Sequence, residues 1–179
     1  MAIRLTLVCS APAAGVRPGT FPVDEPAALV GFAPDLGTIA RLLTAPELRA
    51  RQTAGVIGAA TIEPGLRECD YGIWRGRDLG EIGAADPAGA AAWIADPAAV
   101  PHGGEAIAAL LERVGGWLDR FDAMGHTVAV THPAVIRAAI AHVLAAPATA
   151  FWRIDIEPLS VTDLRRHAGR WTLRAAGRA

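Results

Sequence analysis

The chain has 179 residues, of which 52% are hydrophobic and 20% charged, and its formal net charge is −1. This length suits a single domain with a full hydrophobic core, expected over residues 1–179. A net charge near zero argues against a nucleic-acid-binding protein that relies on neutralising phosphates. No apolar run approaches the roughly 20 residues that span a bilayer. The amino terminus also lacks the long apolar region of a signal peptide, so we expect a cytoplasmic protein with no membrane partner.

Two cysteines, Cys9 and Cys69, are too few for a disulfide framework. No cysteine or histidine spacing typical of a metal site is present, so we expect free thiols, no metal and no cofactor.

The first half of the chain predicts two buried strands joined by a long loop. Residues 4–9 (RLTLVC) are apolar on both faces, as in a central strand. Residues 11–37 are rich in Pro, Gly and Ala and predict an ordered loop, with at most a short helix near residues 25–32. Residues 38–44 predict the second strand and residues 47–59 a helix, whose Arg49 can point back over the sheet edge. Residues 61–63 could add a short strand.

The second half begins with an irregular stretch, residues 66–76, which mixes acids, aromatics and glycines. Binding sites are often built on such stretches, and Glu68 and Asp70 are candidate proton donors, unless the stretch is only a surface turn with one buried Trp. Residues 78–86, 87–95 and 105–121 predict helices, the last from its clear helical spacing of apolar residues. Residues 153–157 and 160–165 predict strands, and residues 171–174 a final strand that closes a terminal hairpin.

The rest of the chain is organised around residues 126–140. Residues 127–130 predict a buried strand, Thr131-His132-Pro133 a tight turn, and residues 134–144 a helix. Ligands bind at the carboxyl ends of strands in open α/β sheets, where a helix amino terminus offers N–H groups. His132 therefore either faces a pocket or merely caps its helix. His102, in the turn before residue 105, likewise faces a pocket or the solvent.

Four segments in this order, RARQTA, LRECDYGIWRG, GGE and VTHPAVIR, resemble the histidine phosphatase superfamily. The resemblance implies an α/β fold, a three-layer αβα sandwich with a mostly parallel central sheet, and no metal. Members of that family transfer or hydrolyse phosphoryl groups through a phosphohistidine. Arg49 falls on the family's phosphate-binding arginine, Glu68 on its proton-donor acid, and His132 on its second pocket histidine, which contacts the phosphoryl group.

The end of the first strand departs from this pattern. Relatives normally carry Arg-His-Gly there, where the histidine is the nucleophile, whereas this chain has Cys9, Ser10 and Ala11. The segment after it is also short, so the helix expected there is reduced. We therefore expect phosphohistidine chemistry to be abolished. The first expectation is a pocket that binds a small anionic or polar ligand without turnover; its ligand-binding residues would be Arg49, Cys9, His102 and Thr131.

Two alternatives keep enzymatic activity. A repurposed dehydratase, isomerase or hydrolase would use Glu68 and His132 as acid and base, or Ser10 or Cys9 as a nucleophile with His132 as its base. A residual phosphatase would take its nucleophile from elsewhere, such as His102 or water. The sequence leaves open the ligand and the oligomeric state.

Overall fold

A mixed β-sheet forms the centre of the molecule. The structure, a computed structural model, describes residues 3–14, 19–29 and 31–178. Within these residues the sheet has six strands in the order β3-β2-β4-β1-β5-β6. Their bounds are β1 Ile3–Cys9, β2 Arg41–Thr44, β3 Thr61–Ile62, β4 Gly125–Thr131, β5 Ser160–His167 and β6 Arg170–Arg178.

The central strands are parallel, and an antiparallel hairpin forms one edge. β1 runs parallel to β4 with Cys9 opposite Thr131, and β2 is parallel to both β3 and β4. β5 is antiparallel to β1 and to β6. The carboxyl ends of β1, β2 and β4 therefore meet at one edge of the sheet, where a site is expected in an α/β fold.

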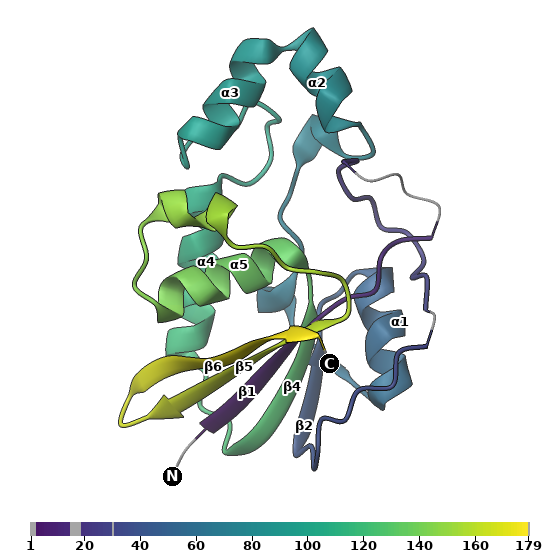
Figure 1. Cartoon of the computed structure of the whole chain (residues 1–179), viewed down its shortest axis with the longest axis vertical. Coiled ribbons are helices and arrows are strands. Elements are labelled where there is room, and N and C mark those ends of the chain that lie inside the picture. Colours follow the sequence, from purple (N-terminus) through teal and green to yellow (C-terminus); the bar gives the residue numbers. More distant parts are fainter. Residues whose placement is uncertain (1–2, 15–18, 30, 179) are drawn as a thin grey trace.

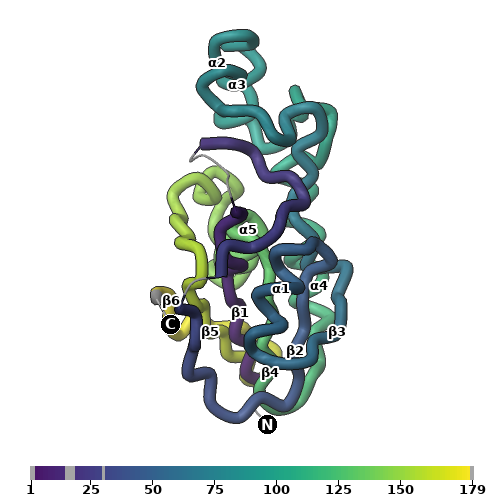
Figure 2. Tube along the Cα trace, turned by 90° about the vertical axis from the view of Figure 1, so that its right-hand side faces the viewer, coloured from purple at the N-terminus to yellow at the C-terminus, as the bar shows by residue number. Residues whose placement is uncertain are grey.

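Helices cover both faces of this sheet. They are α1 Leu48–Ile57, α2 Leu79–Ala85, α3 Pro87–Ala95, α4 Ile107–Arg120 and α5 Pro133–Val143, together with the short 3₁₀ helices η1 Pro64–Leu66, η2 Gly72–Trp74 and η3 Ala148–Arg153. α1 contacts β2 and β4 on one face, whereas α5 packs with α4 and contacts β1 and β6 on the other (Figures 1 and 2). These three layers confirm the predicted α/β sandwich.

The best-predicted elements follow from simple patterns. Residues 128–130 of β4 are fully buried, as their apolar run predicted. In α4 the buried residues recur at helical spacing on one stripe: Ile107, Leu110, Val114 and Leu118. α5 begins at Pro133, where the missing N–H of proline costs no hydrogen bond. In the described part of the chain no helix is both long and apolar enough to cross a bilayer.

α2 and α3 stand apart from the sheet, at the top of both views (Figures 1 and 2). They are held by a second, smaller hydrophobic cluster, whose buried members are Phe21, Trp74, Ile82 and Trp93. The rings pack edge to face or tilted, with Phe21 and Trp93 centroids 5.4 Å apart. We call this unit the α2–α3 cap.

The loop that carries Glu68 is fixed by a close crossing of two backbone segments. The N–H of Glu105 donates to the carbonyl of Asp70 at 2.7 Å, and that of Ile73 to the carbonyl of His102 at 3.0 Å. A Cβ at Gly72 would collide with the His102 carbonyl, and Gly72 also has a φ of +48°. Glycine is the residue that fits both requirements.

One sequence prediction of secondary structure was wrong, and another allowed a short helix that does not form. Residues 153–157 form no strand: η3 ends at Arg153, and β5 starts only at Ser160. Leu159 has a φ of +62° directly after Pro158, which interrupts the extended chain. No helix forms among the described residues of 25–32; Ala27 instead forms an isolated bridge with Ala13. Residue 30 of that range lies outside the described residues.

Candidate functional site

Four predicted residues come together at the carboxyl edge of the sheet. Ser10 directly follows β1, and its N–H donates to the carbonyl of Thr131 at 2.7 Å. His132 follows β4 as the residue that precedes α5. Arg49 lies in the first turn of α1, and Glu68 lies in the loop after η1. The topology thus brings residues from four separate segments to one place.

His132 is the centre of this group and is fully buried. Its Nδ1 accepts a hydrogen bond from Arg49 Nε at 3.2 Å and lies 3.4 Å from Ser10 Oγ. Its Nε2 lies 2.8 Å from Glu47 Oε2. Because Nδ1 accepts, the ring proton resides on Nε2 and is donated to Glu47, which fixes the tautomer. The lone pair of Nδ1 therefore points toward Ser10 and Arg49.

Arg49 links His132 to Glu68. Its Nη2 lies 2.5 Å from Glu68 Oε2 and 3.1 Å from His132 Nδ1, and Glu68 Oε2 is 3.3 Å from the same nitrogen. The guanidinium thus lies against both the carboxylate and the imidazole lone pair, and its charge offsets the repulsion between them. Each of the two paired side chains is 12% exposed, so a charge-assisted pair of this kind is held largely out of water.

Glu47 belongs to the site, although the sequence did not identify it. It precedes α1 but makes no side-chain cap hydrogen bond. One carboxylate oxygen instead accepts from His132, and the other accepts the N–H of Glu68 at 3.1 Å. Burial raises the pKa of Glu47, but the hydrogen bond from His132, together with those from the backbone N–H groups of Glu47 and Glu68, outweighs it and holds the pKa below its usual value. Glu47 is therefore ionised at neutral pH and loses its charge only in acid.

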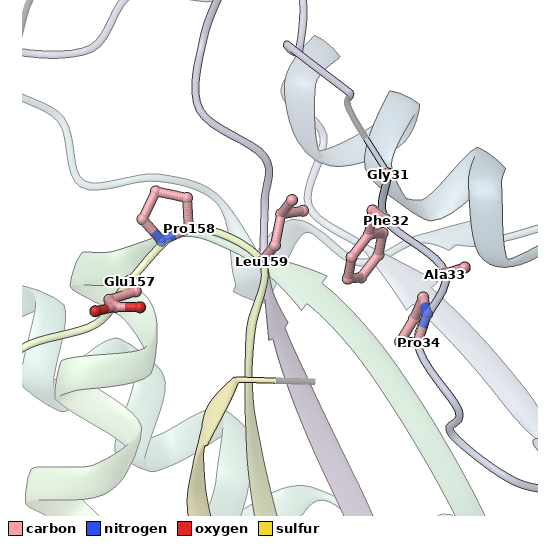
Figure 3. Close-up of a pocket in the computed structure, with 7 residues that line it drawn as sticks. All are labelled: Gly31, Phe32, Ala33, Pro34, Glu157, Pro158 and Leu159. Carbon is pink, nitrogen blue, oxygen red and sulfur yellow. The ribbon is translucent and has the colours of Figure 1, made fainter.

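A cavity of about 450 Å³ opens over the Arg49–Glu68 pair, a size that suits a small-molecule site. Its lining comes from residues 22–24, from the start of α1 and from residues 67–75. The lining residues are Pro22, Val23, Asp24, Glu47, Arg49, Arg67, Glu68, Cys69, Asp70 and Arg75. A second cavity of about 510 Å³, shown in Figure 3, lies between residues 31–34 and 157–159. It contains none of the predicted site residues.

The remaining predicted ligand-binding residues have other surroundings. Cys9 is fully buried within the main hydrophobic core. The Thr131 hydroxyl donates to the carbonyl of Leu66 at 2.7 Å. His102 is fully buried beside the cap cluster, with its ring 5.1 Å from that of Trp74, and its Nε2 has no hydrogen-bond partner. Burial lowers the pKa of His102 despite the opposing charge of Asp70.

The two free cysteines should not react with alkylating reagents in the folded protein. Both are buried. Burial raises the pKa of Cys9 to about 12, with the charge of Glu68 adding to the effect, and burial likewise raises the pKa of Cys69. Because the thiolate is the nucleophile, iodoacetamide at pH 8 should add to neither thiol, and should add to both in urea, as counted by intact mass. Rapid alkylation of Cys9 in the native protein would contradict this assignment.

The group supports acid–base and anion-binding chemistry. It contains an imidazole with an available Nδ1, a cation, a hydroxyl group and two carboxylates. These are the parts that transfer of a phosphoryl or acyl group requires. Among the described residues, no cluster of three or more His, Cys, Asp or Glu side chains could hold a metal ion.

Comparisons with known proteins agree with this fold. The sequence profile of the histidine phosphatase superfamily (branch 1) matches residues 27–178. The chain is 30% identical over 159 residues to the adenosylcobalamin/alpha-ribazole phosphatase of Salmonella typhimurium, covering 80% of this chain and 79% of that one. The structure of a mycobacterial glucosyl-3-phosphoglycerate phosphatase is similar at a TM-score of 0.82, with 20% identity and full coverage of both chains. The alpha-ribazole phosphatase of Shigella flexneri also gives 0.82, with 22% identity over 97% of this chain and 95% of that one. The chain therefore belongs to the histidine phosphatase superfamily, branch 1.

Proposed function

We propose that this protein is a phosphomonoesterase that binds the phosphate group of its substrate at Arg49. The observation that carries the proposal is the placement of the Arg49 guanidinium between the cavity and His132 Nδ1. A cation in contact with both a cavity and a poised imidazole is suited to hold a phosphoryl group during transfer.

The expectation of a pocket that binds without turnover is wrong. Several proteins that match this chain carry the names of phosphatases, and the Salmonella relative matches over most of both chains. Their names favour the phosphatase alternative over binding alone. The residues at the end of the first strand are Cys9, Ser10 and Ala11. They bear on which atom attacks phosphorus, a separate question from whether the phosphate ester is hydrolysed.

Binding of a phosphate ester would begin at the Arg49–Glu68 pair. The substrate oxygens compete with Glu68 Oε2 for the guanidinium, which can bind two oxygens of one phosphate at once. Glu68 Oε2 lies 3.3 Å from His132 Nδ1, so an oxygen that takes its position also lies next to the imidazole. The phosphorus atom is then held beside His132 and Ser10.

Glu68 delivers the proton to the leaving group in this mechanism: its carboxylate takes the proton of the substrate's phosphate monoanion and passes it to the departing alcohol. Displaced from Arg49, its carboxyl group remains at the cavity wall, where the ester oxygen of the departing alcohol lies. The alcohol occupies the rest of the cavity toward Arg67 and Arg75. Relatives are named for alpha-ribazole 5′-phosphate and glucosyl-3-phosphoglycerate, and both of these esters join a phosphate to a polar alcohol.

The direct test is release of inorganic phosphate. Purified protein should hydrolyse p-nitrophenyl phosphate and at least one ester from a panel of alpha-ribazole 5′-phosphate, glucosyl-3-phosphoglycerate and phosphoserine. His132→Gln protein purified in the same way controls for contaminating phosphatases. Equal phosphate release by the two preparations, or none by the unaltered chain across the panel, would overturn the proposal.

A further inference from the structure

We infer that Ser10 is the nucleophile of this phosphatase, that His132 is its general base, and that Glu47 positions the imidazole. The inference rests on the proposed function and specifies the atom that receives the phosphoryl group. It is carried by three side chains that contact one another in sequence: Ser10 Oγ is 3.4 Å from His132 Nδ1, and His132 Nε2 is 2.8 Å from Glu47 Oε2.

The proton on the His132 imidazole is placed as transfer from Ser10 to His132 requires. Arg49 Nε donates to His132 Nδ1, so that nitrogen carries a lone pair, and the lone pair can accept the proton of the Ser10 hydroxyl once the guanidinium turns to the phosphate oxygens. The opposite nitrogen carries the hydrogen that is donated to Glu47. A serine hydroxyl is a weak nucleophile unless a base removes its proton, and an imidazole oriented by a carboxylate is a known solution. The 3.4 Å separation is long, as it often is before substrate binds.

Burial restricts which group can attack. Ser10 is 3% exposed and lies at the end of β1, where Thr53 Oγ1 accepts the N–H of the next residue, Ala11, at 3.0 Å. Both Ser10 Oγ and Glu68 Oε2 lie close to His132 Nδ1. A phosphate oxygen that replaces Glu68 Oε2 on Arg49 therefore brings phosphorus toward the hydroxyl. The Cys9 thiol, by contrast, lies in the core, and His102 lies beside the cap cluster.

The reaction takes two chemical steps, transfer of the phosphoryl group to Ser10 and hydrolysis of the phosphoserine. In the first, the Ser10 Oγ–P bond forms as the bond from phosphorus to the ester oxygen breaks. The hydroxyl proton passes to His132 Nδ1. Glu68, displaced from Arg49, takes the proton carried by the phosphate monoanion of the substrate and passes it to the departing alcohol. In the second, water attacks the phosphoserine and gives its proton to Glu68. The Oγ–P bond then breaks, and His132 returns the proton to Ser10. No oxidant, metal or further reactant is needed.

The chain itself offers a matched control, because its serines are only Ser10 and Ser160. Ser160 begins β5 and makes no contact with His132 among the described residues. Trypsin places the two serines in different fragments, since Arg41 and Arg153 lie between them. A phosphoserine can therefore be assigned by mass spectrometry.

The experiment is a rapid acid quench of the full chain during turnover of p-nitrophenyl phosphate. We expect a burst of p-nitrophenolate close to the enzyme concentration and one added phosphoryl group in the fragment with Ser10. The label should survive acid and be lost in strong alkali, which is the behaviour of phosphoserine. Phosphohistidine behaves in the opposite way, because it is hydrolysed in acid. Ser10→Ala should lose the label and lower kcat by about 10³-fold or more, while Ser160→Ala keeps both.

Glu47→Gln tests the positioning role separately. It keeps an oxygen that can accept from His132 but removes the charge, so kcat should fall on the order of 10²-fold with little change in KM. The phosphoserine should still form, only more slowly. A purely structural role would instead lower the melting temperature without this division between kcat and KM.

Several results would overturn the inference while leaving the phosphatase function intact. They are turnover by Ser10→Ala at the normal rate, an acid-labile label on His132, and steady hydrolysis with no covalent label at all. Failure of the proposed function looks different, because the unaltered chain would then release no phosphate from any ester of the panel. A single burst of labelled Ser10 without further turnover would support Ser10 and overturn the phosphatase.

Discussion

Arg49→Ala should lower kcat/KM for p-nitrophenyl phosphate by about 10³-fold, which corresponds to about 4 kcal/mol of lost transition-state stabilisation. Arg49 is the cation that contacts both Glu68 and His132, and its side chain is only 12% exposed. Charges held out of water interact more strongly with a transferring phosphoryl group than exposed ones do. The measurement is steady-state kinetics, together with calorimetric titration of inorganic phosphate.

Two further variants make the Arg49 result specific. Arg49→Lys keeps the charge, but its single ammonium cannot bind two phosphate oxygens in one plane, so it should recover only part of the lost rate. Arg51→Ala removes an exposed arginine two residues along the same helix and should leave kcat/KM unchanged. Phosphate binding by Arg49→Ala as tight as that of the unaltered chain would contradict the role given to this residue.

His132→Gln should be more damaging still, lowering kcat on the order of 10⁴-fold. The glutamine amide is close to the imidazole in size and can both donate and accept hydrogen bonds, but it cannot take up a proton. His132 is completely buried and in contact with Ser10, Arg49 and Glu47, so the change removes the group that accepts the Ser10 proton from the centre of the site. Losses of this size are typical when the base of a coupled group is removed.

His142→Gln is the control for this change. It lies on the same helix, and its Nε2 is 2.8 Å from Asp119 at the surface. Exposed ion pairs contribute little to stability, so both the melting temperature and kcat should stay close to normal. An active His132→Gln enzyme would show that His132 is not the proton acceptor. A comparable loss in His142→Gln would show that the effect comes from α5 as a whole.

The sequence predicted most of the site because its signals were local. The strand, turn and helix around His132 are each coded by neighbouring residues, and the parallel pairing of β1 and β4 then places Ser10 beside His132. Local patterns made Arg49 and Glu68 candidates, the family resemblance gave them roles, and the structure brings both to the same imidazole.

Glu47 was missed because its sequence position already has a sufficient local explanation. An acidic residue after proline at a helix start suits the helix dipole, and nothing in the sequence connects it to a histidine 85 residues later. His102 gives the opposite case. Its turn was compatible with a pocket, yet the aromatic side chains of the cap cluster surround it. Both outcomes depend on tertiary packing, which no local pattern records.

The separate packing of the α2–α3 cap also bears on motion. Four buried side chains hold the cap cluster, whereas the sheet and its flanking helices share a much larger core. Opening the cap locally costs less free energy than unfolding the sheet. Phe21 and Trp74 of the cap cluster directly adjoin Pro22 and Arg75 of the cavity lining, so local opening of the cap would also move this part of the lining. The cavity beside Arg49 is therefore expected to change shape at a lower free-energy cost than the sheet that carries His132.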